Sequence, residues 1–79
     1  MHLLQVQTGK LVRVKKFTGG ENLEYKLRQL GLLPGDYARV LRFAPMGGPI
    51  LIDVGGRSIA LGRGIASKVE VEDAGCDLS

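Results

Sequence analysis

The sequence contains few of the side chains that enzymes use. Its 79 residues include one cysteine, one histidine and no tryptophan. A single cysteine excludes an internal disulfide, which fits a reducing compartment. A nucleophilic pair of His2 and Cys76 would require both chain ends to meet, and a further group to orient them. We therefore predict a protein that is not an enzyme, and we identify no catalytic residue.

Clustered metal ligands are also scarce. Divalent cations need several His, Cys or carboxylate ligands close together. Glu70, Glu72 and Asp73 are neighbours in sequence, but Glu70 and Glu72 point outward from a predicted strand. Cys76 and Asp77 would join them only loosely. We predict no bound metal and no other cofactor, and the glycines do not form a P-loop.

Long apolar runs are absent. No window approaches the roughly 20 apolar residues that span a bilayer. The first ten residues, MHLLQVQTGK, lack the apolar centre of a signal peptide. We predict a cytoplasmic protein that does not insert into a membrane.

The charge is only mildly positive, with 11 Lys and Arg against 8 Asp and Glu. The densest basic group is Arg13, Lys15 and Lys16, in a predicted strand. It reads either as a solvated strand face or as a phosphate-binding patch, which needs several converging cations. Aromatic residues for base stacking are few, and we expect at least Phe17 and Phe43 in the core. Nucleic acid is therefore the less favoured partner.

Alternating apolar residues indicate several short strands. Val12 and Val14 alternate with charged residues, which is typical of a half-buried strand. In the segment 36–45, apolar residues fall on both faces of the expected strand. This indicates either that both faces are partly buried or that a bulge shifts the alternation. Gly55-Gly56 predicts a tight hairpin turn. The expected strands are 10–17, 36–45, 50–54, 57–61 and 68–72, with a small strand or covering arm at 3–6 and a helical turn at 62–66.

One short helix is expected between the first two of these main strands. Leu23, Leu27 and Leu30 are spaced to share one helical face. Gly31 is suited to end the helix, and Pro34 prevents its resumption. A helix of two to three turns is unstable alone, so we expect this face to pack against the sheet.

A small sheet with one apolar face buries that face by curling. We therefore predict a mainly β fold, a small SH3-like barrel of about five strands with one short α-helix. The barrel domain is expected at 1–73, followed by a disordered tail at 74–79. An open sheet edge is able to pair with a second copy of the chain, so a homo-oligomer is an expectation too.

The order of four motifs resembles the FeoA family. They are LGLLPG at 30–35, PMGGPI at 45–50, GRSIAL at 56–61 and ASKVEV at 66–71. The resemblance extends over roughly 3–72. The same module is similar to the C-terminal domain of iron-dependent repressors of the DtxR type. Those repressors begin with a helix-turn-helix domain, for which no residues are left here.

The resemblance implies an accessory protein of bacterial ferrous iron uptake that docks on the cytosolic GTPase domain of the transporter FeoB. Leu32 and Leu33 follow the expected end of the helix at Gly31, so they do not easily point the same way. Either both leucines fold under the barrel or one of them is exposed. An exposed leucine would form an apolar patch with the loop at 45–49. The alternatives are a nucleic-acid-binding small β-barrel or a metal-regulator-like domain. The predicted docking residues are Lys26, Arg28, Leu32, Leu33, Pro45 and Met46.

Overall fold

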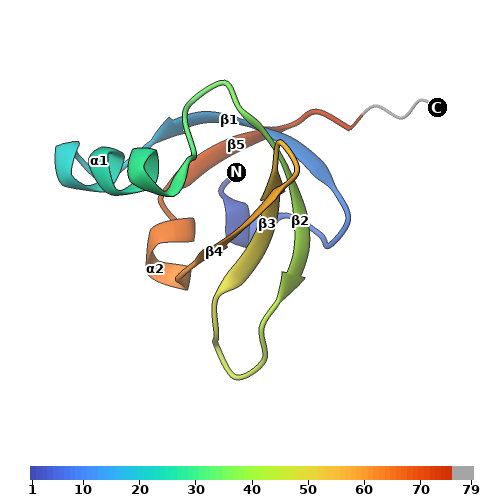
Figure 1. The fold of residues 1–79 in the computed structure, drawn as a ribbon. Coiled ribbons are helices and arrows are strands. Elements are labelled where there is room, and N and C mark those ends of the chain that lie inside the picture. The colour runs from blue at the N-terminus through green and yellow to red at the C-terminus, as the bar shows by residue number, and fades with distance from the viewer. Residues whose placement is uncertain (76–79) are drawn as a thin grey trace.

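A computed structural model of the chain describes residues 1–75. Five antiparallel strands form one curved sheet in the order β4-β3-β2-β1-β5, with the helices on one side (Figure 1). The predicted mainly β fold, a small barrel with one short α-helix beside it, is confirmed. The elements are η1 (Leu3–Gln5), β1 (Leu11–Phe17), α1 (Glu21–Leu30), β2 (Tyr37–Phe43), β3 (Ile50–Val54), β4 (Arg57–Leu61), α2 (Arg63–Ala66) and β5 (Val69–Asp73).

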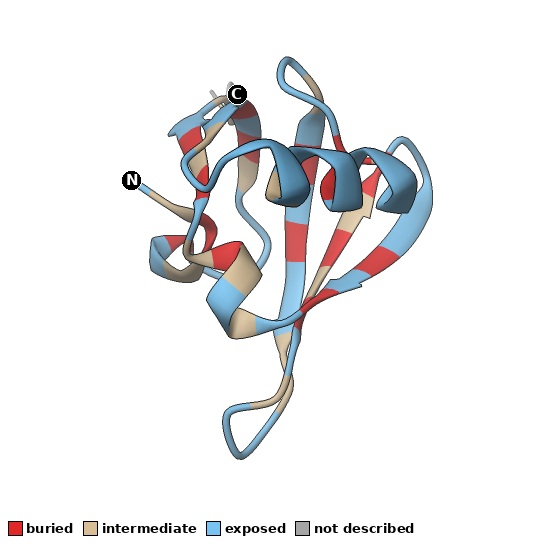
Figure 2. Ribbon diagram, turned by 90° about the vertical axis from the view of Figure 1, so that its left-hand side faces the viewer, coloured by how far each residue is buried: buried red, intermediate tan, exposed pale blue. Residues whose placement is uncertain are grey.

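Buried and exposed residues alternate along the strands, as the bands in Figure 2 show. The alternation is interrupted twice. The register between β2 and β3 shifts between Val40 and Arg42, and that between β1 and β5 shifts between Val14 and Lys16. The shift in β2 confirms the bulge alternative for the segment that favoured neither face. In β1 the shift leaves Lys15 and Lys16 exposed one after the other.

The core is aliphatic throughout. Side chains from every strand and from the three short helical segments converge inside the curved sheet, and no polar residue of the described chain is buried. Phe17 and Phe43 pack against this core from its margin. The buried residues are Leu3, Val6, Val12, Val14, Leu27, Leu32, Ala38, Val40, Ile50, Ile52, Val54, Ile59, Leu61, Ala66, Val69 and Val71.

The N-terminal segment covers one edge of the sheet. The expected strand or arm at 3–6 forms the short 3₁₀ helix η1, with Leu3 fully buried. Ahead of it, His2 forms an isolated bridge with Glu70, and the Val71 N–H donates to the Met1 carbonyl at 2.7 Å. The outer edge of β5 is therefore paired with the first two residues.

The hairpin turn and the helical turn also form where the sequence places them. Gly55 and Gly56 have φ values of 61° and 88°, which is the left-handed pair that a two-residue hairpin requires. α2 buries Ala66 and leads into β5. Within the predicted tail, the Ala74 N–H donates to the Leu11 carbonyl, and residues 76–79 lie outside the described residues.

Candidate docking surface

The helix α1 is held to the sheet by few side chains. Leu27 is its one fully buried residue, and Leu23 is half-buried. Leu30 keeps 37% of its surface exposed, so the expectation that it lies on the buried face is wrong. Lys26 and Arg28 are both exposed on the same helix. The helix is therefore a projecting element with most of its surface free (Figure 2).

The corner after α1 is fixed by backbone hydrogen bonds. Gly31 takes φ 98° and ends the helix, as the sequence predicts. The Leu32 N–H donates to the Leu27 carbonyl at 2.9 Å. The Gly35 N–H donates to the Val14 carbonyl at 2.7 Å, which ties the corner to β1.

The two leucines of the corner point in different directions. Leu32 is fully buried, so its assignment to a docking surface is corrected. Burial follows from its position directly after the helix end, where a hydrophobic contact usually closes the cap. Leu33 is 43% exposed, and its N–H donates to Asp36 Oδ2 at 2.8 Å. Leu33 therefore presents an apolar side chain from a rigid turn, next in sequence to the exposed end of α1.

The loop between β2 and β3 presents Pro45 and Met46 to solvent. Met46 is completely exposed and has φ 60°, a conformation that non-glycine residues seldom adopt. The loop is braced from α2, because Arg63 donates through Nε to the Gly48 carbonyl at 2.9 Å and through Nη2 to Ala44 at 3.4 Å. Nothing in the local sequence around Arg63 indicates this contact.

The corner and the loop lie at opposite ends of the molecule. In Figures 1 and 2, the connection from α1 to β2 lies at the upper end and the β2–β3 loop at the lower end. The structure therefore does not bring Leu33 and Met46 into one patch. It offers two separate apolar sites, one at Leu33 in the corner and one at Met46 in the loop. The site at the corner adjoins α1, which carries Lys26 and Arg28.

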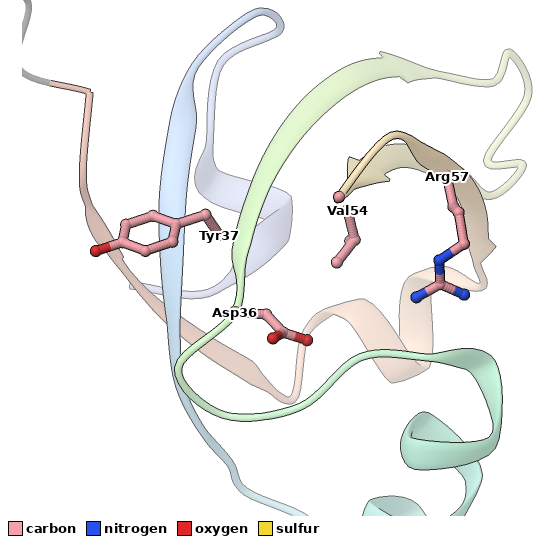
Figure 3. Close-up of a pocket in the computed structure, with 5 residues that line it drawn as sticks. Asp36, Tyr37, Val54 and Arg57 are labelled. Atoms are coloured by element: carbon pink, nitrogen blue, oxygen red, sulfur yellow. The ribbon is translucent and has the colours of Figure 1, made fainter.

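An open depression of about 410 Å³ lies beside the corner (Figure 3). It is lined by Asp36, Tyr37, Val54, Gly55 and Arg57. Both charged side chains form hydrogen bonds to the backbone. Asp36 accepts from the Leu33 N–H, and Arg57 donates to the Gly31 carbonyl at 3.2 Å. Tyr37 points away from the depression in Figure 3. The arrangement is that of a shallow surface, with no pair of ionisable groups placed for proton transfer among the lining residues.

The acidic residues near the C-terminus form ion pairs. Glu70 pairs with the N-terminal ammonium of Met1 at 3.2 Å, and a hydrogen bond from that ammonium holds the Glu70 pKa below its usual value. Two hydrogen bonds lower the pKa of Asp73. The larger effect comes from the Gly75 N–H, and the smaller from the Lys10 ammonium, which lies 3.2 Å from Asp73 Oδ2.

Arg13, from the densest basic group, forms an ion pair with Glu72, with 3.0 Å between Nη1 and Oε2.

Within residues 1–75 no group of three His, Cys, Asp or Glu side chains is close enough to hold a metal ion. Cys76 and Asp77 lie outside the described residues.

No helix within residues 1–75 is long and apolar enough to cross a membrane.

Comparison with known proteins identifies the family. Residues 1–73 match the FeoA domain family. A protein of Methanocaldococcus jannaschii assigned as an Fe(2+) transport protein A is 39% identical over 66 residues, which cover 84% of this chain and 78% of that protein.

Solved structures agree with that match. A crystal structure of an iron uptake regulatory protein (FeoA) has a TM-score of 0.81 and 38% identity, over 91% of this chain and 93% of that one. The solution structure of an iron(II) transport protein A from Clostridium thermocellum has a TM-score of 0.87 and 33% identity. That similarity covers 95% of this chain but only 46% of the Clostridium chain.

The fold is also found in a manganese regulator. The manganese regulator SloR has a TM-score of 0.82 at 22% identity, over 92% of this chain and 34% of that chain. At this identity the similarity concerns the fold alone. The family match over residues 1–73 and the 39% identical relative carry the assignment instead, and the chain belongs to the FeoA family.

Proposed function

We propose that this chain is a non-enzymatic cytoplasmic accessory protein of bacterial ferrous iron uptake, and that it docks on the cytosolic GTPase domain of FeoB. Relatives with this fold are named for iron(II) transport or iron uptake. The described residues offer exposed apolar side chains on rigid turns rather than a cleft with converging ionisable groups. Such surfaces are typical of proteins that act by contact with another macromolecule.

The observation that carries the proposal is the exposure of Leu30 and Leu33. Leu30 is the last residue of a helix that buries little of its own surface. Leu33 lies in the corner that follows, where its N–H donates to Asp36 Oδ2 and its carbonyl accepts from the Asp36 N–H. A pre-ordered surface loses little conformational entropy on binding. Lys26 and Arg28 on α1 supply a basic border that favours an acidic partner surface.

The test is a titration of the FeoB GTPase domain with the full chain and with single variants. Leu33→Glu and Leu30→Glu place a charge in the proposed contact, and we expect each to weaken binding about tenfold or more. Leu41→Glu is the matched control, because Leu41 is an equally exposed leucine (39%) on β2. Met46→Glu tests the loop separately. Circular dichroism confirms that each variant is folded.

The outcomes separate the partner from the surface. Normal binding by the Leu30→Glu and Leu33→Glu variants would exclude the corner, and weak binding by the Met46→Glu variant alone would assign docking to the β2–β3 loop. If the unaltered chain does not bind the GTPase domain, the FeoB proposal fails. Loss of iron(II) uptake in cells that carry the Leu33→Glu variant, but not in those with Leu41→Glu, would link the contact to transport.

A further inference from the structure

The two edges of the sheet differ. β5 forms one edge, and it is covered by Met1 and His2 through the bridge to Glu70 and the hydrogen bond to Val71. β4 forms the other edge. Its residues Ser58 and Ala60 are exposed, and β3 is its one strand partner within residues 1–75.

The geometry of the β3–β4 hairpin shows which backbone groups of β4 are free. A two-residue turn is closed by a hydrogen-bonded pair, here Val54 and Arg57, and hydrogen-bonded pairs then alternate with non-bonded ones. Ser58 and Ala60 fall in the non-bonded pairs, so their N–H and C=O groups point away from β3. No backbone group within residues 1–75 pairs with them from the outer side.

The β4 edge lacks the features that usually prevent edge pairing. Apart from Arg57 at the turn, whose guanidinium donates to the Gly31 carbonyl, its exposed side chains are those of Ser58 and Ala60, which are small and uncharged. Its pairing with β3 runs through five residue pairs without a register shift. Edge strands that avoid pairing normally carry charges, a proline or a bulge. The opposite edge shows the contrast, because β5 carries Glu70, Glu72 and Asp73.

We propose that the β4 edge pairs antiparallel with β4 of a second copy of this chain, about a two-fold axis at Ile59. In this register Ser58 lies opposite Ala60 of the second copy, so each free N–H and C=O of these residues gains a partner. Arg57 lies opposite Leu61 of the second copy, and no like charges face each other.

Neighbouring registers are less favourable. Centring the axis on Ala60 would place Ser58 opposite Gly62 of the second copy, which lies beyond the end of β4. Centring it on Ser58 would place Ala60 opposite Gly56 in the turn, beyond the end of the strand. The register at Ile59 is the one of these three that pairs both Ser58 and Ala60 with residues of β4 in the second copy.

The assembly closes at two copies. An isologous contact uses the same edge on both chains, and the β5 edge of each chain is already paired with its own N-terminus. A contact confined to one short strand is smaller than the interfaces of about 1,200–2,000 Å² that hold stable complexes. The dimer is therefore weak and depends on protein concentration.

Two double variants at the same positions test the register. Ser58→Glu with Ala60→Glu sets two acids opposite each other, and we expect the dimer dissociation constant to rise at least tenfold. Ser58→Glu with Ala60→Lys sets an acid opposite a base, and we expect association at least as tight as that of the unaltered chain. Sedimentation equilibrium of the full chain over a range of concentrations measures both constants.

Amide hydrogen exchange provides a readout that does not depend on substitutions. The Ser58 and Ala60 amides should exchange more slowly as the concentration of the unaltered chain rises, while the Gly9 amide, bonded within the chain to Val40, should not change. A chain that stays monomeric at millimolar concentration would overturn the proposal and leave the edge to a strand of another protein. Equal association of the two double variants, or protection confined to other amides, would overturn it as well.

Discussion

At the corner after α1, the backbone of Gly31 and the side chain of Arg57 occupy adjoining space. Gly31 has φ 98°, and a Cβ built there would lie 2.6 Å from the guanidinium nitrogens of Arg57. Arg57 in turn donates to the Gly31 carbonyl at 3.2 Å. Two separate features therefore favour glycine at this position. One is the left-handed backbone conformation, and the other is the close approach of the Arg57 side chain. The conformation should dominate, because the end of an arginine side chain is able to move.

We expect Gly31→Ala to lower the free energy of unfolding by about 1–2 kcal/mol, the usual cost of a left-handed alanine. Urea unfolding followed by far-UV circular dichroism measures the change. The same substitution in an Arg57→Ala background should cost the same to within about 0.5 kcal/mol, since conformational strain does not depend on the neighbour. Full recovery of stability in that background would show instead that the contact with Arg57 dominates.

At the scale of elements, α1 depends on very few contacts. Leu27 is fully buried between the helix and the sheet, whereas Leu30, one turn later on the same predicted stripe, is exposed. A ten-residue helix is marginal on its own, so its attachment must come from packing. The packing is concentrated at Leu27, which leaves the end of the helix free to serve as a contact surface.

We expect Leu27→Ala to cost about 2–5 kcal/mol, because it removes buried methyl groups and leaves a cavity. Leu30→Ala is the matched control on the same helix and should cost clearly less, about 1 kcal/mol or below, because Leu30 keeps 37% of its surface exposed. Thermal and urea unfolding of the two variants checks the difference. Similar losses in both would contradict the unequal attachment of the two ends of α1.

The contrast between Leu27 and Leu30 shows how far the sequence predicts this fold. Periodicity identifies the strands, the helix and the Gly55-Gly56 turn, because each is a local pattern. It indicates which face of α1 is apolar but not how far the sheet extends beneath it, so it does not predict that Leu30 is exposed. For the same reason it assigns both Leu32 and Leu33 to the docking surface, although Leu32 is buried and Leu33 alone is exposed. The contacts of Arg57 and Arg63 join distant segments and leave no local signal.

At the scale of the whole molecule, the chain closes on itself through its first residue. The Met1 ammonium contacts Glu70, which is 69 positions away in the sequence. The hydrogen bond and charge of the ammonium, together with Lys15 and Lys16, lower the pKa of Glu70 in the folded state below its ordinary value of 4.5. A carboxylate with a lowered folded pKa stabilises the fold when ionised, above the unfolded value, and loses this effect as the pH falls through the folded value.

We expect Glu70→Gln to reduce stability near neutral pH, with the deficit disappearing as the pH falls below 4.5 and through the folded pKa of Glu70. The effect should be small because the pair is exposed to solvent. Urea unfolding of both proteins across this pH range measures the difference. A deficit of the same size at acid pH would attribute it to lost packing rather than to charge.

The positions of the two tyrosines determine which optical signals this molecule offers. The chain has no tryptophan, and Tyr25 and Tyr37 remain 61% and 56% exposed when the protein is folded. Intrinsic emission should thus change little on unfolding. Tyr25 lies on α1 and Tyr37 begins β2 next to the corner, so quenching of that emission would report a macromolecule arriving at this end of the barrel.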